Sequence, residues 1–387
     1  MVQVASIFSQ LLKEIPRCQF QGLVRKHGAE RASKGFTSWK HLVSMLFCHL
    51  ARAESLRDIE NGLAATEGKL IHLGMDEAPA HSTLSYANAH RPPELFLDLF
   101  HLLLDRFQGL GMNMRKKKFR FKNRLLSLDA TVIPLCLSLF PWAEFRRKKG
   151  GVKLHVLLDH DVYMPRFVDL TAAKKHESTV AWEIQLPEES IVAMDMGYTD
   201  YALYEAWTRD RIWFVTRQKE HAAYEVVETK EVPLNRNILS DEIIRLTGPK
   251  APKDLLLRRV VVWVEEKGEE LVLLTNHLHF GATTIAAIYK ERWEIEQFFK
   301  TLKQHLTIRT FVGTSEKAVL TQIWTALIAL LIIKWLHFRS KIGLAFATLA
   351  GVLRMILFTY RDLETWLREP FRTPPLVPNL TQPLPFR

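Results

Sequence analysis

A short apolar run that carries a single acid is the feature that most restricts how this chain can fold. Residues 125–133 read LLSLDATVI, and Asp129 is the only ionisable residue in that run. Apolar and β-branched residues in succession are typical of a central strand that is buried on both faces. Because a buried strand does not tolerate a lone carboxylate, we expect a charged partner or a metal ion beside Asp129.

A second acid closes a similar run. Residues 191–198 read IVAMDMGY, with Asp195 at the end of a short apolar segment and Gly197 marking a sharp turn after it. Acids at strand ends are placed for function rather than for packing. Capping of a following helix is an equally good explanation of Asp195 taken alone.

A third acid lies in a helix predicted over residues 288–306. At about 100° per residue, one face of this helix carries four polar side chains beside an apolar stripe. These side chains are Tyr289, Arg292, Glu296 and Lys303. A carboxylate between two cations suits a site that holds a divalent metal and receives a phosphodiester. An ordinary surface ion pair between Arg292 and Glu296 is the alternative, but the two further acids favour a site.

The segments between these acids predict the architecture. In chain order they are strands over 125–133, 152–158 and 164–170, a helix over 177–186, the strand of Asp195, a helix over 201–207, a strand over 211–217 and the helix of Glu296. This is the order of the ribonuclease H-like fold, so we predict an α/β core of that type. The long stretch before the last helix contains a plausible hairpin around Lys267-Gly268, which predicts a β-rich insertion.

The residues before the core show helical rather than strand patterns. Short helical patterns without a convincing strand predict an all-α domain, with a capping box at residues 55–58 and a short helix over 81–90. Small polar groups on and after that helix suit a DNA major groove; they are Ser82, Thr83, Ser85, Asn88 and Arg91. A plain helical bundle is the alternative.

The chain is therefore predicted to divide into six parts. They are a helical DNA-binding domain over 1–110, a basic linker over 111–124, the core over 125–217 and 283–345, the β-rich insertion over 218–282, and a C-terminal helix with a Pro-rich tail over 346–387.

The charge of the chain favours a polyanionic partner. Its 53 Lys and Arg residues exceed its 42 Asp and Glu residues, for a net charge of +11. Residues 115–124 hold seven cations and no acid directly before the Asp129 strand. That position favours contact with a phosphate backbone over a merely solvated linker.

Several other classes of protein and site are disfavoured. Cys18, Cys48 and Cys136 are isolated, which supports neither a disulfide framework nor a Cys-rich zinc site and fits a reducing cytoplasm. We find no Gly-rich phosphate loop, so no nucleotide cofactor is implied. Residues 318–336 are long and apolar, but Gln322 and Lys334 interrupt them. We expect a helix buried against the sheet of the core there and no membrane partner.

The spacing of the polar helix face carries a resemblance. Tyr, two residues, Arg, three residues, Glu, six residues and Lys is the pattern of the DDE transposases of bacterial insertion sequences, the IS-four group, and this chain is similar to it at every position. The similarity extends from residue 7 to about residue 336. One departure is Met196, which stands where that family usually has Arg after its second acid.

The resemblance implies a function, sites and partners. Asp129, Asp195 and Glu296 would be catalytic acids that bind two Mg²⁺ or Mn²⁺ ions roughly 3.5–4 Å apart. The enzyme would bind double-stranded DNA at the ends of an insertion sequence, cleave it, join the 3′ ends to target DNA, act as a homodimer and work in the bacterial cytoplasm at the nucleoid. The expected DNA contacts are Tyr289, Arg292 and Lys303, with Lys153, Arg217, Arg115, Lys116, Lys117 and Lys118.

Three alternatives remain open. A nuclease of the same fold would share the acids but lack strand transfer. A non-enzymatic DNA-binding regulator would use the basic surface alone. A rival metal cluster of Asp159, Asp161 and Asp169 is disfavoured, because the first two members lie in an apparent hairpin turn where Asp is common.

Overall fold

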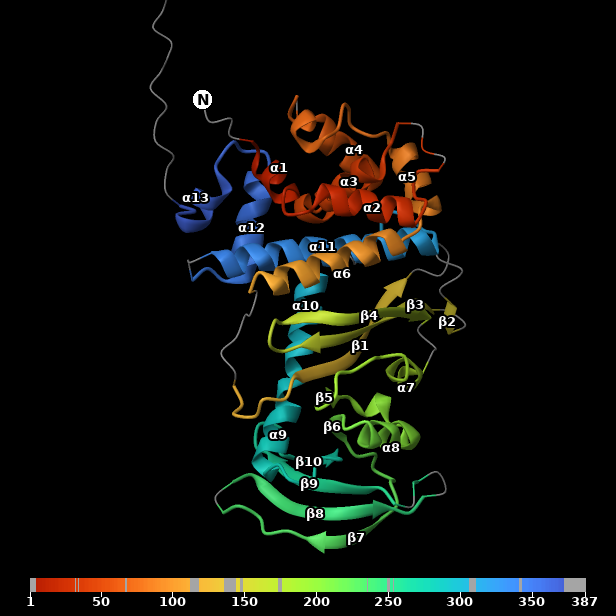
Figure 1. Ribbon diagram of the computed structural model, residues 1–387, viewed down its shortest axis with the longest axis vertical. Helices are drawn as coiled ribbons and strands as arrows, with labels where there is room; N and C mark the ends of the chain where they lie inside the picture. The colour runs from red at the N-terminus through yellow and green to blue at the C-terminus, as the bar shows by residue number, and fades with distance from the viewer. Residues whose placement is uncertain are drawn as a thin grey trace, which may run out of the picture.

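A computed structural model describes residues 5–371 of the chain. The description leaves out residues 32, 34, 67, 112–117, 136–143, 147–148, 173–175, 235, 249–250, 253, 306–310 and 341–342. Figure 1 shows three tiers along the long axis: helices at one end, an α/β sheet in the middle and an antiparallel extension of that sheet at the other end.

The N-terminal tier is helical, as the sequence predicts. Its helices are α1 Ile7–Leu12, α2 Arg17–Lys26, α3 Ser38–Ala51, α4 Leu56–Ala64, the 3₁₀ turn η1 Lys69–Leu73, α5 His81–His90 and α6 Glu94–Gly109. The predicted capping box is confirmed, because the Ser55 side chain accepts from the Asp58 amide and the Asp58 carboxylate accepts from the Ser55 amide. This reciprocal pair satisfies two amides that the first turn of α4 leaves without helical partners.

The core sheet has the predicted ribonuclease H-like order. Its elements are β1 Leu125–Leu135, β2 Glu144–Arg146, β3 Lys149–Asp159, β4 Met164–Ala172, α7 Glu177–Ala181, β5 Ile191–Met194, α8 Tyr201–Arg209 and β6 Trp213–Arg217. Strand β3 lies antiparallel between β1 and β4, while β1, β5 and β6 run parallel to one another. The strand β2 was not predicted; it pairs with the start of β3.

The predicted insertion extends this sheet rather than forming a separate one. Its strands are β7 Tyr224–Thr229, β8 Ile238–Leu246, β9 Leu256–Val264 and β10 Glu269–Thr275. Strand β10 pairs antiparallel with β6, and β9, β8 and β7 follow outward. The predicted hairpin is confirmed as β9–β10, whose turn needs a glycine because Gly268 has a φ of 63°.

The helix predicted over residues 288–306 differs in its bounds. The structure has α9 Ala282–Glu291 and α10 Trp293–His305, separated at Arg292. The backbone of Arg292 still has φ −53° and ψ −30°, so the two helices continue in nearly one direction and form the column beside the sheet in Figure 1. The regular helix is therefore interrupted at Arg292, one of the four residues of the predicted polar face.

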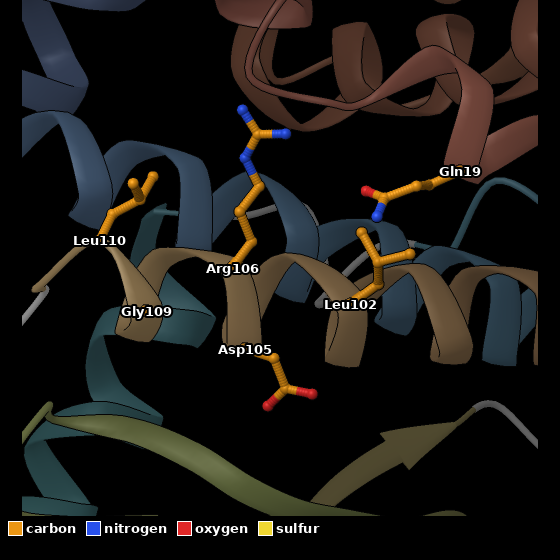
Figure 2. Close-up of a pocket in the computed structure, with 6 residues that line it drawn as sticks. All are labelled: Gln19, Leu102, Asp105, Arg106, Gly109 and Leu110. Carbon is orange, nitrogen blue, oxygen red and sulfur yellow. The ribbon is translucent and has the colours of Figure 1, made fainter.

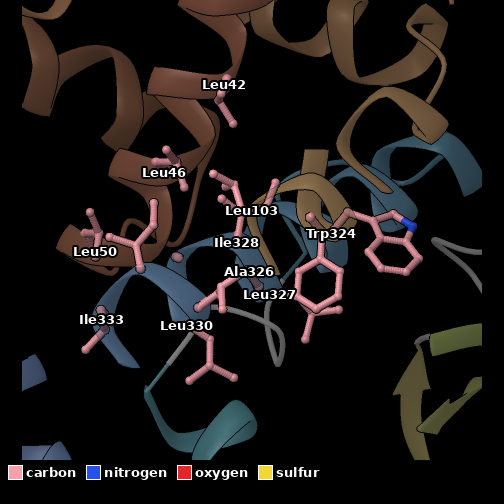
Figure 3. Close-up of a cluster of buried hydrophobic side chains, with 14 of the residues drawn as sticks. Leu42, Leu46, Leu50, Leu103, Trp324, Ala326, Leu327, Ile328, Leu330 and Ile333 are labelled. Atoms are coloured by element: carbon pink, nitrogen blue, oxygen red, sulfur yellow. The ribbon is translucent and has the colours of Figure 1, made fainter. Parts of the chain in front are cut away.

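The predicted apolar core helix is α11, Glu316–Arg339. It is long and apolar enough to cross a membrane, but 94% of its most apolar window is buried inside the structure. Its main partners are α3, α5, α6 and α12 (Phe346–Ile356) rather than the sheet that the sequence suggested, and a short last helix, α13 Leu363–Arg368, follows. Figure 3 shows side chains of α11 meeting those of α3 and of α6, so α11 joins the ends of the chain into one core.

The two faces of the core sheet bury different sets of side chains. Leu125, Ile191 and Ala193 pack toward α9, whereas Leu126, Leu128 and Met194 pack toward α8. Because side chains alternate along a strand, every residue of β1 and β5 can be assigned to one of these faces.

Candidate active site

The end of the parallel pairing between β1 and β5 places Asp129, within β1, and Asp195, directly after β5, together. Leu128 of β1 and Met194 of β5 are register partners, and each acid is the next residue along its chain. By alternation, Asp129 shares the face of Leu125, which is the face that α9 and α10 cover. Asp195 follows Ala193 in the same alternation and is directed to that face as well.

Helix α10 adds the third acid through an arginine bridge. Arg292 donates from Nη1 to Oδ2 of Asp129 at 2.9 Å and from Nη2 to Oε1 of Glu296 at 2.9 Å. Its guanidinium also lies over the ring of Tyr289, with 5.5 Å from Cζ to the ring centroid. The pair Arg292–Glu296 therefore exists, but the same guanidinium ties the helix to the strand of Asp129.

The electrostatics join all three acids. The pKa of Asp129 is raised to about 6, chiefly by burial and also by the charges of Asp195 and Glu296, against the attraction of Arg292. Burial alone would lower the pKa of Arg292, but Tyr289 and the three carboxylates hold it above its ordinary value. The site is an acidic cluster with one cation between its members.

The ligand chemistry fits a hard divalent cation, since carboxylate oxygens are the donors that Mg²⁺ and Mn²⁺ prefer. Within the described part of the chain, no three Asp, Glu, His or Cys side chains lie close enough together to hold a metal ion. The guanidinium of Arg292 occupies the space between Asp129 and Glu296.

The capping alternative for Asp195 is not what the structure has. Asp195 precedes a 3₁₀ turn, η3 Met196–Tyr198, but its side chain makes no cap hydrogen bond. Helix α8 is capped instead by Asp200, whose Oδ1 accepts from the Ala202 and Leu203 amides.

The rival acid cluster has structural partners. Asp159 is buried, accepts from Arg166 Nε at 2.6 Å and accepts from the Asp161 amide at 2.9 Å. These contacts are the turn chemistry that the sequence favours for these acids.

Lys303 lies further along α10, on the same side of the sheet as the acids. Its Nζ donates to Oγ1 of Thr131 at 2.6 Å and approaches the carbonyl oxygen of Val132 at 3.4 Å. These partners follow Asp129 on β1, so Lys303 holds a cation beside the part of the strand directly after that acid.

A groove adjoins the site between the α9–α10 junction and the β9–β10 hairpin. Its volume is about 690 Å³, and its walls include Tyr289 and Arg292. Lys118 and Arg217, both predicted as DNA contacts, also line it, as do the part-exposed rings of Trp263 and Trp293. Lys118 forms an ion pair with Glu291, which fixes the described end of the basic segment beside the site.

Other predicted contacts lie elsewhere. Lys153 pairs with Glu177 at 3.0 Å. Its register partner on β1 is Val132, so it lies on the sheet face opposite α10. Arg115, Lys116 and Lys117 lie outside the described residues.

The prediction for α5 was partly wrong. Ser82, Thr83 and Ser85 are exposed, but Asn88 and Arg91 are buried. Oδ1 of Asn88 accepts from Nε2 of His41 at 2.7 Å, and Arg91 donates to the carbonyl oxygens of Phe36 and Thr37. Both are fastened inside the helical tier because their positions on the helix face α3, which helical spacing alone did not reveal.

Two further hollows lie in the helical tier. One, of about 600 Å³, runs between α5 and residues 28–36. The other, of about 570 Å³, lies at the end of α6; Figure 2 shows Asp105 and Arg106 pointing to opposite sides of that helix. The second has no charge preference that would select a phosphate.

The sequence analysis missed the role of Glu177 beside the turn that follows Asp195. A Cβ at Gly197 would overlap Oε2 of Glu177 and would stand 3.0 Å from its carboxyl carbon. Gly197 was the available signal, because a glycine in a tight turn near a functional acid often marks a close approach by another group.

Comparison with known families matches most of the described core. A model described as "Transposase DDE domain" matches residues 120–332, more than half of the chain, and a domain of unknown function, DUF4372, matches residues 3–76. The chain is 30% identical over 298 residues to the Sinorhizobium fredii protein y4zB, covering 76% of this chain and 82% of that one. It is 28% identical over 267 residues to the protein of the insertion sequence element IS5377 from Geobacillus stearothermophilus, covering 67% and 68% of the two chains. Both relatives are named as transposases.

Proposed function

The chain belongs to the DDE transposases of insertion sequences, and from that premise we propose that Asp129, Asp195 and Glu296 carry its chemistry. The family assignment makes it an enzyme that cleaves and transfers DNA. The observation that supports these three acids is their arrangement: Asp129 within β1 and Asp195 directly after β5 follow register-matched residues, and Arg292 joins Asp129 to Glu296 on α10.

The three carboxylates would hold two Mg²⁺ or Mn²⁺ ions. When bound, such ions activate a water or a 3′-hydroxyl and stabilise the leaving oxygen. The residues of the chain prepare the site: Asp129 is desolvated by burial, and Arg292 restrains Asp129 and Glu296 through two hydrogen bonds. Release of either carboxylate from Arg292 would free that guanidinium to bind a phosphate.

Double-stranded DNA would approach along the groove and the basic segment beside it. Arg292, Lys303 and Arg217 would contact phosphates near the scissile bond. The ring of Tyr289, which lies against the guanidinium of Arg292, would hold that side chain in place. Lys118 would contact a further phosphate, as would Arg115, Lys116 and Lys117, which precede it in the sequence. The helical region over 1–110 would bind the ends of the element, and the paired ends would be held by a homodimer in the bacterial cytoplasm.

One assay tests this function and separates it from a nuclease without strand transfer. Purified protein is incubated with MgCl₂, a duplex that carries the element's terminal sequence, and a target plasmid. We expect both nicked ends and joined products. Cleavage without joining would favour the nuclease, and binding without cleavage would favour a regulator.

A variant series tests the acids. Asp129→Ala, Asp195→Ala and Glu296→Ala should each abolish cleavage. Without a bound metal these carboxylates repel phosphates and do not contribute to DNA binding. End binding in the absence of metal should therefore stay within a few fold of the native value. Glu183→Ala, an exposed acid beyond α7, is the control. Full cleavage by one of the three variants would remove that residue from the site.

A further inference from the structure

The turn after Asp195 crosses from one face of the sheet to the other. Asp195 is directed to the face of α10, whereas Tyr198, three residues later, is fully buried in the core on the α8 face. Between them η3 closes with hydrogen bonds from the Tyr198 amide to the Asp195 carbonyl at 3.1 Å and from the Thr199 amide to the Met196 carbonyl at 3.1 Å. The position of Asp195 therefore depends on what holds this turn from behind.

The first support is a buried chain of hydrogen bonds. The hydroxyl of Tyr198 and Nδ1 of His155 are 3.0 Å apart, and Nε2 of His155 and Oγ1 of Thr171 are 3.0 Å apart. All three residues are buried. Because a buried polar group left without its partner destabilises the fold, this chain of hydrogen bonds fixes Tyr198 to strands β3 and β4.

The second support is an ion pair against the backbone of Gly197. Helix α7 packs on η3, and the Glu177 carboxylate lies where a side chain at position 197 would be. Lys153 holds that carboxylate at 3.0 Å, and both side chains are largely shielded from solvent. Only glycine permits this approach, so the turn rests directly on the Lys153–Glu177 pair.

Both supports come from one strand. Lys153 and His155 are two residues apart on β3 and therefore project to the same face. Their register partners are Val132 and Ala130, which follow Asp129 on β1. One strand thus sets the turn of Asp195 relative to the strand of Asp129.

We propose that Lys153, Glu177, His155 and Tyr198 form a seat that positions Asp195 against Asp129, and that Lys153 acts there instead of contacting DNA. The proposal rests on the proposed function, since it assigns Asp195 to the site. These four residues are positioning residues: they act through the turn and do not touch the reacting strand.

The seat makes a prediction about metal dependence. Glu177→Gln and Lys153→Gln should each lower the cleavage rate about 10–100-fold, the range found when a group behind a metal ligand is lost. The MgCl₂ concentration at half-maximal rate should rise in both variants, and the increase in melting temperature on adding MnCl₂ without DNA should shrink. Lys153→Arg should recover most of the rate, because it restores the pair with Glu177.

DNA binding distinguishes the seat from a phosphate contact. If Lys153 is a seat residue, end binding without metal and its slope against salt stay unchanged in Lys153→Gln. If it neutralises a phosphate, the slope of log K against log salt flattens by roughly 0.9. A flattened slope with unaltered MgCl₂ dependence would overturn the proposal.

A double-mutant cycle tests the contact at Gly197. Gly197→Ala should cost far more activity in the native background than in a Glu177→Ser background, where the overlapping carboxylate is gone. Additive effects would overturn the proposal. Cleavage by the native protein and by Asp195→Ala is measured in parallel. If the native protein does not cleave, the proposed function is wrong. If the native protein cleaves and the seat variants cleave equally well, the seat alone is wrong.

Discussion

At Lys303 a structural role and a DNA-binding role predict clearly different effects of a mutation on the salt dependence of DNA binding. The Nζ atom of Lys303 bonds to Thr131 on β1, so removal of this side chain loses a part-buried hydrogen bond worth about 0.5–1.5 kcal/mol. If it also neutralises a phosphate, Lys303→Ala weakens end binding and flattens the salt slope by roughly 0.9. We expect both effects, measured by titration of an end duplex at several salt concentrations.

Lys300 provides the matched control, since it is an exposed cation on the same helix. Lys300→Ala should leave the slope as it is. An equal change in both variants would indicate general attraction by the basic chain rather than a contact beside β1.

Arg292 shows what the sequence could not reveal at this scale. The spacing predicted its place beside Glu296, and its i,i+4 pair is present. The bond to Asp129 joins residues 163 positions apart. No local pattern encodes a contact of that separation, because it depends on how α10 lies over β1.

Among the elements, α3 carries two buried histidines that couple stability to pH. His41 contacts Asn88 of α5, and His49 contacts Thr325 of α11 at 3.0 Å. Burial lowers the pKa of each to about 3, below the ordinary value near 6.5. Between these values the unfolded chain binds protons that the folded chain does not, so stability is complete above about pH 6.5 and falls as the pH falls.

We therefore expect each histidine to cost about 2 kcal/mol of stability when the pH is lowered from 7.5 to 5. Urea unfolding at both pH values measures this loss. A His41→Gln/His49→Gln variant should lose correspondingly less on acidification, whereas His90→Gln, at an exposed position, should behave as the native chain does. An identical loss in all three proteins would contradict the assignment.

The insertion depends on one buried ion pair. Arg258 donates to both carboxylate oxygens of Asp241, at 2.7 and 2.6 Å, and both side chains are almost fully buried. Asp241→Ala should destabilise the protein by about 3–5 kcal/mol, because it leaves the Arg258 charge uncompensated in the interior. Thermal or urea unfolding measures the loss.

The exposed pair Arg245–Glu225, also between neighbouring insertion strands, is the control. Glu225→Ala should cost about 0–1 kcal/mol. Equal losses for the two variants would show that the buried pair contributes no more than a surface one.

Elements were predicted where local periodicity decides them. The apolar runs of β1 and β5, the hairpin around Gly268 and the capping box at Ser55 were all read correctly, because each signal lies within a few residues. Strand β2 and the interruption at Arg292 were missed. The first depends on pairing with β3, and the second on tertiary contacts of the arginine side chain.

At the scale of the whole molecule, α11 unites regions that the sequence suggested were separate. Its apolar side chains share a core with α3, α6 and α12. A fragment of residues 1–110 would expose the surfaces that α11 covers, and we expect it to lack a cooperative unfolding transition. Joining residues 311–371 to that fragment should restore one, as circular dichroism against temperature would show. Cooperative unfolding of the short fragment alone would contradict this dependence.

The position of α11 also has a consequence for synthesis of the chain. The N-terminal helices leave the ribosome first, but their buried surface is completed by a helix that ends at Arg339. At about 5–20 residues per second, roughly 10–50 s separate the emergence of α6 from that of α11. The helical tier, which is the part expected to grip the ends of the element, thus matures only when the nascent chain is nearly finished. A truncated chain that ends before α11 would contain the N-terminal helices but would lack the fully folded surface that is expected to bind DNA.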